Sequence, residues 1–469
     1  FRTSLSQMKP DLDLMFTCGV NHVYFHGSCY TPKDDPWPGW KFYASIDMSP
    51  TNSIWRDAPY LMQYIERCQT FLQMGQPDND FLVYLPVRDM WRKRGKSLLL
   101  QFEINSMDEK APEFISSILK IDSLGYDCDY ISDRQLAKVT VKDGRLVTEG
   151  GTCYRGLIIP TGTTVDDRLA PLLAPLADYV VYGEDEARLS LLAKAEDLRA
   201  RLGLRAIRRS TSDGYHYFIA NLTPRDVCSS VALSVGFKSA MLYDPMSGTI
   251  KPAALTADGR VNISLRSGQS CILKVTDAPA AAVATSRQQC SRKASKTIDT
   301  PWTLTFIEES PHVSGTFRLD SLQTWETLSD SAAVTMGTGV YETTFTLTKK
   351  ELQQLSAAGS AEIDLGDVRE SARVYLNGQL LGCAWAVPYV LSCGDLLRKG
   401  TNQLRIEVTN LPANRIADMD CRGIAWRKMK EINVVDLNYK KTTYASWAPV
   451  PSGMRGPVVI GGGCCAAVK

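Results

Sequence analysis

The stretch Gly19-Val20-Asn21-His22-Val23-Tyr24-Phe25-His26-Gly27 decides how the first part of the chain is interpreted. Its centre is rich in β-forming residues and glycines close both ends, so it predicts a strand. Upstream, residues 9–16 begin with Lys-Pro-Asp, which predicts a helix. Downstream, residues 59–74 carry apolar side chains at helical spacing and predict a second helix. The order helix, strand, helix is typical of one corner of a barrel or of a layered α/β sheet.

Aromatic and imidazole side chains gather in and after this stretch. His22, Tyr24 and His26 stand at alternate positions, so in a strand all three point to one face. The loop of residues 28–58 adds further aromatic residues, namely Tyr30, Trp37, Trp40, Tyr43 and Trp55. Trp and Tyr combine a flat apolar face with a polar edge, which suits a sugar ring. The same residues could instead fill a core beneath a long loop, and the sequence leaves both interpretations open.

Carboxylates near this loop do not form a convincing catalytic pair. Hydrolysis of a glycosidic bond usually needs two carboxyl groups, one acting as acid and the other as base or nucleophile. The loop offers only Asp34, Asp35, Asp47 and Asp57, and the first Glu of the chain is Glu66 on the following helix. Each of these could equally be a surface residue. The segment therefore predicts a wall that contacts sugar, without an acid and base of its own.

Residues 77–210 alternate between strand and helix patterns. Strands are predicted at residues 81–85, 130–131 and 157–160, and helices at residues 111–124, 170–176 and 184–201. This alternation is typical of a parallel sheet with helices on its faces.

Short strands dominate from Asp213 onward. Strands are predicted at residues 215–221, 231–235, 240–243, 261–265 and 270–275, which together suggest a small β-sandwich. Residues 278–296 lack any period and predict a linker. The last part of the chain again shows many strands with regular turns, and Asn377-Gly378 is a strong hairpin signal because both residues tolerate positive φ. We expect a jelly-roll sandwich there.

Composition narrows the classes of function. The chain has 469 residues, and at roughly 100–200 residues per domain this predicts three or four domains. The net charge of +2 argues against a nucleic-acid partner, which would need a large basic excess. No apolar run is long enough to cross a membrane. The 13 Cys show no C-x-x-C spacing and His residues number only four, so no metal site is expected.

One weak alternative for chemistry lies in the α/β region. The stretch Gly151-Thr152-Cys153-Tyr154-Arg155-Gly156 loosely resembles a nucleophile elbow, with Cys153 as the nucleophile of an amidotransferase-like enzyme. Its second glycine stands one residue late, and the next His is His216 in the following β region. A structural Cys beside a strand is the preferred interpretation.

Several motifs together resemble glycoside hydrolase family 106, whose members are α-L-rhamnosidases that trim plant pectins. Residues 19–27, 30–32 and 37–45 look like the end of the family's catalytic barrel. Residues 64–69, 83–86 and 129–136 look like its α/β domain, and residues 414–416, 422–423 and 452–458 like its terminal sandwich. The runs at residues 341–345 and 374–378 are also similar to the sugar-binding jelly roll of family 2 glycosidases.

The resemblance implies a multidomain protein that combines α/β and all-β parts. Residues 1–76 would be the last strand, loop and helix of a (β/α)8 barrel, and residues 77–210 a flavodoxin-like or amidotransferase-like α/β domain. A small β-sandwich at residues 211–277 and the linker at 278–296 would follow. Residues 297–462 would form a galactose-binding-like jelly roll.

The resemblance also implies which functions the chain keeps. The family's two catalytic Glu residues and its calcium ligands precede the matched region, so no catalytic residue and no cofactor is assigned here. The resemblance implies a substrate-binding role for five residues, namely His22, His26, Tyr30, Trp37 and Trp40. The sequence begins at Phe1 with no signal peptide, so we expect the C-terminal part of a longer enzyme, inactive alone and able to pair with the missing half.

The expected partner is a rhamnose-containing oligosaccharide or polysaccharide, cleaved by an inverting acid and base mechanism. The family resemblance implies a periplasmic or secreted location. A different class of function stays open, in which the chain is a non-catalytic carbohydrate-binding protein whose C-terminal jelly roll holds the glycan.

Overall fold

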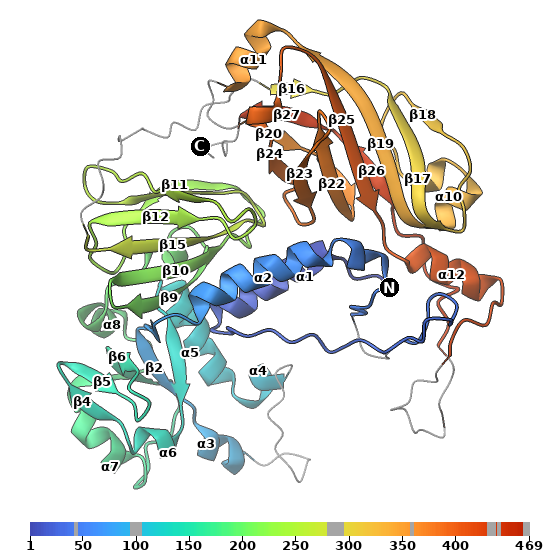
Figure 1. The fold of residues 1–469 in the computed structure, drawn as a ribbon. Helices are drawn as coiled ribbons and strands as arrows, with labels where there is room; N and C mark the ends of the chain where they lie inside the picture. Colours follow the sequence, from blue (N-terminus) through green and yellow to red (C-terminus); the bar gives the residue numbers. More distant parts are fainter. Residues whose placement is uncertain are drawn as a thin grey trace.

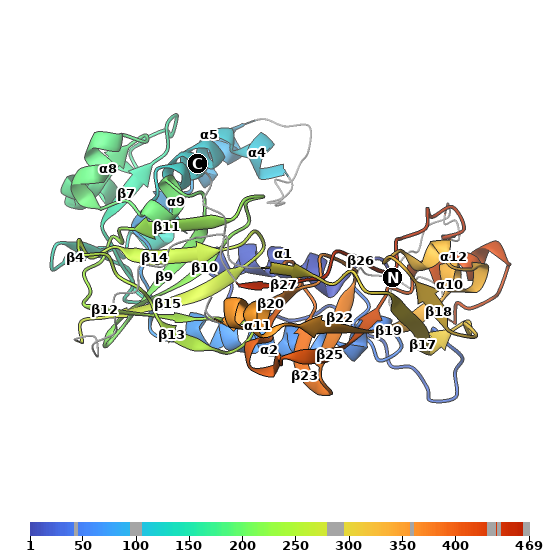
Figure 2. The ribbon, with the colours of Figure 1, turned by 90° about the horizontal axis from the view of Figure 1, so that it is seen from above.

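The computed structural model describes residues 1–41, 46–93, 106–278, 295–356, 361–428, 438 and 442–462. Two long helices lie between a β-rich unit in the middle of the sequence and a C-terminal β-sandwich, and an α/β unit adjoins the middle unit on its other side (Figure 1). Seen from above, the molecule is elongated, with the α/β unit and α12 (Ala413–Cys421) at opposite ends (Figure 2).

Both predicted helices form, although the first begins at Leu5 rather than near Lys9 and so contains Pro10 in its interior. The first helix, α1 (Leu5–Thr17), begins with a capping box in which Ser4 and Gln7 each bond the other's backbone, an arrangement that satisfies amides at a helix start. The second, α2 (Ala58–Leu72), buries the predicted apolar face. That face consists of Leu61, Tyr64, Ile65, Cys68 and Leu72.

The helices join the middle β unit to the C-terminal sandwich. The ring of Phe16 packs edge-on at 5.5 Å from Phe218 of the middle sheet, and Tyr64 packs at 5.7 Å from Trp385 of the sandwich. A buried ion pair reinforces the first contact, because Lys9 Nζ lies 2.7 Å from Asp13 and donates to the Gly268 carbonyl at 2.9 Å. A single core cluster therefore contains side chains from all three parts.

The strand predicted at residues 19–27 is wrong. The segment is extended but pairs with no strand in the part of the chain that the structure describes. Side chains of α2 and of its C-cap residue take the place of a neighbouring strand: Gln69 accepts from the Val23 amide at 2.6 Å, and Gln73 donates to the Asn21 carbonyl at 2.6 Å. The alternation survives without pairing, since the side chains of Val23 and Phe25 pack against the core.

The α/β unit contains the predicted parallel sheet. Its four strands run in the order β3, β2, β7, β8 and all pairs are parallel. Separate apolar clusters cover the two faces, as expected for a sheet with helices on both sides. The strands and longest helix of this sheet are β2 (Phe81–Tyr84), β3 (Cys128–Ile131), β7 (Gly156–Ile159), β8 (Val180–Tyr182) and α5 (Pro112–Ser123).

The same unit departs from the sequence prediction in two places. The helix expected at residues 184–201 is two short helices, α8 (Glu186–Leu192) and α9 (Asp197–Ala200). The break lets Glu196 reach Arg208 of the next unit, with Oε1 at 2.8 Å from Nη1. An antiparallel sheet of three short strands, not predicted, also follows β3; the strands are β4 (Thr140–Lys142), β5 (Arg145–Val147) and β6 (Cys153–Tyr154). The remaining helical segments are α3 (Val87–Arg92), α4 (Met107–Lys110), α6 (Asp133–Leu136), α7 (Ala170–Leu173) and the 3-10 turn Ala174–Tyr179.

The middle unit is antiparallel, with a six-stranded sheet in the order β1, β9, β10, β15, β12, β13 and a two-stranded sheet of β11 and β14. Strand β9 crosses the boundary that the sequence suggested at residue 211, and it pairs along its whole length with β10. The strand expected at residues 231–235 lies earlier, as β11 (Val227–Val231). The other strands are β1 (Gln76–Pro77), β9 (Arg205–Thr211), β10 (Gly214–Ala220), β12 (Ser239–Tyr243), β13 (Ile250–Pro252), β14 (Val261–Leu265) and β15 (Ser270–Thr276).

The C-terminal unit has a six-stranded sheet, in the order β18, β17, β19, β25, β22, β23, and a four-stranded sheet, in the order β16, β27, β20, β24. One apolar core contains side chains of both sheets. The expected hairpin is confirmed, since Asn377 and Gly378 have φ of 53° and 83° between paired strands. The strands are β16 (Ser295–Thr297), β17 (Trp302–Ser310), β18 (Phe317–Leu319), β19 (Met336–Leu347), β20 (Ala361–Asp364), β21 (Asp367–Arg369), β22 (Ser371–Leu376), β23 (Gln379–Ala384), β24 (Val390–Ser392), β25 (Gly400–Thr409), β26 (Gly453–Gly456) and β27 (Val459–Gly462). Two short helices, α10 (Asp330–Val334) and α11 (Lys349–Ser356), flank the sheets.

Most of the expected linker at residues 278–296, and Tyr43 of the aromatic loop, lie outside the described residues. Within the described ranges, each helix is too short or too polar to pass through a bilayer.

Candidate functional site

The extended segment of residues 20–30 presents a row of exposed ring side chains. His22 and Tyr24 stack with ring centroids 4.5 Å apart and planes inclined by 20°. Tyr24 is 81% exposed and Tyr30 is 84% exposed, and His26 is also exposed. The shared face that the spacing predicted for His22, Tyr24 and His26 is therefore present. Large aromatic surfaces facing solvent are unusual unless they meet a ligand or a partner.

The two tryptophans of the following loop are held in a different way. The Trp37 indole donates to the Thr51 carbonyl at 2.8 Å, and the Trp40 indole donates to the Asp35 carboxylate. Both side chains are half-buried. The sequence left open whether these aromatic residues fill a core beneath the loop or face a sugar. The two tryptophans are partly packed beneath the loop, whereas the side chains of His22, Tyr24, His26 and Tyr30 are exposed.

Trp37 belongs to a group that we call the aromatic cluster, consisting of Phe1, Trp37, Trp426, Tyr444 and Trp447. Tyr444 and Trp447 stack with centroids 4.2 Å apart, and Trp426 lies 6.2 Å from Tyr444. The Arg427 guanidinium lies 4.2 Å from the centre of the Trp426 ring. The C-terminal members follow α12 in the sequence, and no periodic pattern links them to Trp37, so sequence reasoning missed them.

The carboxylates near the loop are engaged in structural contacts. Asp47 lies 2.6 Å from Lys41 Nζ, and Asp35 lies 3.8 Å from Lys428. Burial lowers the pKa of Lys41 from its usual value, an effect that Asp47 opposes. Asp57 is fully buried and accepts from Ser371 at 2.6 Å. These groups brace the loop and join it to the sandwich, and none of the three combines with another as an acid and base pair.

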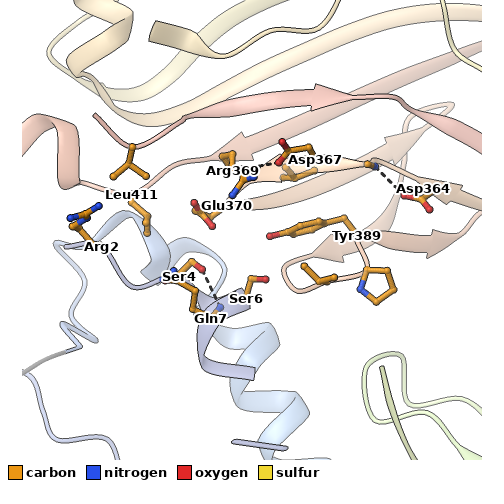
Figure 3. A pocket seen from close by; sticks show the side chains of 15 residues that line it. Arg2, Ser4, Ser6, Gln7, Asp364, Asp367, Arg369, Glu370, Tyr389 and Leu411 are labelled. Atoms are coloured by element: carbon orange, nitrogen blue, oxygen red, sulfur yellow. Dashed lines mark hydrogen bonds and ion pairs between the residues drawn. The ribbon is translucent and has the colours of Figure 1, made fainter. Parts of the chain in front are cut away.

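A polar cavity of about 610 Å³ lies where the first turn of α1 meets the C-terminal sandwich (Figure 3). Ser4, Ser6 and Gln7 line it from the helix side. The opposite wall comes from residues 364, 366–370 and 387–389 of the sandwich, and Leu411 and Val450 also line the cavity. No sequence pattern indicated this cavity, because its walls are more than 350 positions apart in the chain.

Two titratable groups of the cavity have shifted pKa values. Burial raises the pKa of Glu370 above its usual value, although Arg369 and a hydrogen bond with Ser4 both oppose the shift. Burial also raises the pKa of Tyr389, whose hydroxyl bonds Ser6. Each sandwich residue is thus tied to the helix by one serine, and the Glu370 carboxyl takes up a proton more readily than an exposed Glu.

The alternative centred on Cys153 finds no support in the geometry. Cys153 Sγ lies 3.6 Å from the Gly151 carbonyl, in the short strand β6. His216, the candidate base, lies in the middle unit and its Nε2 bonds the Phe71 carbonyl at 2.7 Å. The cysteine and histidine are therefore not brought together.

Metal chemistry has no ligand set here either. Among the residues that the structure describes, no three side chains of His, Cys, Asp or Glu are arranged to hold a metal ion. The calcium that the family resemblance implies does not fit any of these residues.

Comparison with known proteins agrees with the sequence resemblance. The family model of glycoside hydrolase family 106, described as α-L-rhamnosidase, matches residues 1–187. This match contains the exposed row, the tryptophan loop and most of the α/β unit. The structure is similar to that of a rhamnosidase from Novosphingobium sp. PP1Y, with a TM-score of 0.72 and 21% identity over 98% of this chain. At this identity the likeness establishes the fold.

A curated relative from Formosa agariphila, provisionally named a β-glucuronidase, is 29% identical over 160 residues, or 30% of this chain. The chain covers 46% of the Novosphingobium rhamnosidase and 14% of the Formosa protein. It therefore spans less than half the length of each.

Proposed function

We propose that the chain is the C-terminal portion of a glycoside hydrolase that removes terminal α-L-rhamnose from pectin-type polysaccharides. The observation that carries the proposal is the match of residues 1–187 to the α-L-rhamnosidase family model, because these residues include the exposed row. In this proposal His22, His26, Tyr30, Trp37 and Trp40 form one wall of the substrate site.

The chemistry of the row supports contact with a sugar. Rhamnose has a methyl group and an apolar ring face, which can lie against Tyr24 or Tyr30, and hydroxyls that imidazole nitrogens can bond. The stacked pair of His22 and Tyr24 supplies a flat surface of this kind. The half-buried Trp37 and Trp40 hold the loop in place and would contact sugar only through their exposed edges.

We propose that the acid and base of an inverting mechanism come from residues outside this sequence. Inverting hydrolysis needs two carboxyl groups on opposite sides of the sugar, about 6.5–9.5 Å apart. Asp35, Asp47 and Asp57 are each held in contacts that brace the loop. The polymeric substrate favours a periplasmic or secreted location.

Two measurements on the full chain test this proposal. We expect no release of nitrophenolate from 4-nitrophenyl α-L-rhamnopyranoside, and turnover by these 469 residues alone would overturn the placement of the acid and base. We expect saturation-transfer NMR to detect bound methyl α-L-rhamnopyranoside, with the signal lost in Tyr30→Ala and kept in Tyr182→Ala, an exposed tyrosine of the α/β unit. Equal signals from both variants would contradict the proposal that these residues form a wall of the substrate site.

A further inference from the structure

The cavity between α1 and the sandwich is built from both polar and apolar groups. Ser4 and Ser6 contribute hydroxyls from the helix, and Glu370 and Asp367 contribute carboxylates from the sandwich (Figure 3). Val387, which is 51% exposed, and Leu411 add apolar side chains to its lining. A volume of about 610 Å³ falls within the range of roughly 300–1,000 Å³ that small-molecule sites occupy.

The charges of this cavity favour a neutral ligand. Asp367 lies 2.7 Å from Arg369, and Asp364 lies 3.3 Å from Arg266, so these carboxylates are already paired. Three carboxylates line the cavity against two guanidiniums, those of Arg2 and Arg369. Because Arg266 also pairs with Asp364, the positive and negative groups at the cavity nearly balance, and no excess charge is left to attract an ion. A metal ion is also unsuited, because none of the described residues forms a ligand set.

Closely spaced donors and acceptors beside apolar patches match the surface of a carbohydrate. Sugar hydroxyls both donate and accept, so they can bond Glu370 and a serine at once, while C–H groups pack on Leu411 and Val450.

Arg2 links the cavity to the aromatic cluster. Arg2 lines the cavity, and its guanidinium lies 5.2 Å from the centre of the Trp447 ring. Val450 of the cavity follows Trp447 by three residues in the same segment. A glycan whose end lies in the cavity can therefore place its next units against Trp447 and Tyr444, which stack at 4.2 Å.

We infer that this cavity is a carbohydrate subsite that holds one or two units of a neutral oligosaccharide, with the rest of the glycan directed along the aromatic cluster. The inference rests on the proposed function in one respect, namely that the protein acts on glycans. The subsite is separate from the exposed row of residues 20–30, because none of those residues lines it. It would hold a polymer near the hydrolytic site and raise the local concentration of substrate.

The test is calorimetric titration of the full chain with a neutral disaccharide, 6-O-α-L-rhamnosyl-D-glucose, and with trigalacturonic acid as the acidic probe. We expect the neutral probe to bind more tightly. Glu370→Gln should weaken its binding about tenfold, the effect of losing one charge-assisted hydrogen bond. Val387→Trp places a larger side chain in the lining of the cavity and should remove the cavity's share of the binding, while binding at the exposed row remains. Val141→Trp, at an exposed valine of the α/β unit, is the matched control and should bind like the wild type.

Thermal unfolding of each variant checks that the fold is intact. Unchanged binding in both Glu370→Gln and Val387→Trp would overturn the subsite, as would the absence of heat from the folded wild type or tighter binding of the acidic probe. The proposed function can fail independently of the subsite. If Tyr30→Ala has no effect on rhamnoside binding while the two cavity variants bind the disaccharide less well, the subsite is supported and the substrate wall is contradicted.

Discussion

Two interfaces between units of this molecule, which we call the Arg208 seam and the α1 seam, differ in how their polar groups are hydrogen-bonded. Between the α/β unit and the middle sheet, Arg208 lies 2.6 Å from Asp78, 3.0 Å from Asp80 and 2.8 Å from Glu196. Its side chain is 6% exposed, and the acidic partners are buried as well. Between α1 and the C-terminal sandwich, by contrast, the polar groups surround a cavity of about 610 Å³.

This difference distinguishes polar groups whose bonds stabilise the protein from polar groups that can still bond a ligand. At the Arg208 seam every guanidinium nitrogen bonds the protein, including the Asp78 carbonyl at 2.8 Å, so no group is left for a ligand. At the α1 seam Glu370 and Tyr389 each bond one serine and still face open space. Densely paired buried charge fixes the arrangement of units, whereas partly satisfied groups around a void can bind something else.

The largest loss of stability is expected from removing the Arg208 side chain from the Arg208 seam. Arg208→Ala leaves three buried carboxylates without their main partner, and loss of one partner of a buried ion pair costs about 3–5 kcal/mol. Urea unfolding followed by tryptophan fluorescence measures the loss. Lys138→Ala, which removes an exposed pair with Glu149, is the control and should cost less than about 1 kcal/mol. Equal effects of the two variants would contradict a structural role for the Arg208 seam.

A smaller loss is expected where α2 is fastened to the sandwich. Asp57 is fully buried, accepts from Ser371 at 2.6 Å and lies 2.7 Å from Arg373. Asp57→Ala leaves those donors unsatisfied and should cost about 2–3 kcal/mol, measured by urea unfolding beside the exposed control Asp34→Ala. A cost no greater than that of the control would show that the contact does not hold the two parts together.

At the α1 seam, in contrast, we expect a substitution that stabilises the protein, and the size of its effect should depend on pH. Folding raises the pKa of Glu370, so the folded state disfavours its charged form. The resulting penalty is absent below the usual pKa of 4.5 and grows as the pH rises through the raised value. Glu370→Gln removes it, and we expect the variant to be about 0.5–1 kcal/mol more stable than the wild type at pH 7 and equal to it at pH 4. A variant less stable than the wild type at pH 7 would contradict the cause given for the shift.

The smallest effect on stability is expected at the exposed row. Tyr30→Ala removes a side chain that is 84% exposed, and such changes usually stay within about 0.5 kcal/mol. Thermal unfolding of Tyr30→Ala beside the wild type measures this. A loss larger than about 1 kcal/mol would mean that Tyr30 supports the fold rather than awaiting a ligand.

Local sequence patterns predict the local structure well. Helical spacing indicates α2 and its buried face, and Asn377-Gly378 indicates the hairpin. The strand at residues 19–27 fails for a physical reason: a strand needs a paired neighbour, and here Gln69 and Gln73 supply the hydrogen bonds instead. Alternation predicts which side chains face outward but not what pairs with the backbone.

Long-range contacts account for what the sequence could not predict about the site. The exposed row is continuous in sequence, so its shared face follows from spacing alone. The partners of Trp37 in the aromatic cluster, Trp426 and Tyr444, lie nearly 400 residues later. The cavity depends on Ser4 meeting Glu370, which stands 366 positions later in the chain. Neither pairing leaves a periodic signal in the chain.

The central claim is that the exposed row of residues 20–30 contacts rhamnose-containing glycan. Hydroxyl-radical footprinting with mass spectrometry, on the full chain with and without saturating 6-O-α-L-rhamnosyl-D-glucose, tests it most directly because it reports each aromatic side chain separately. We predict that Tyr24 and Tyr30 become protected while Trp91 and Tyr182, exposed aromatics of the α/β unit, oxidise at unchanged rates. Unchanged oxidation of Tyr24 and Tyr30 with the sugar at saturation would contradict the account.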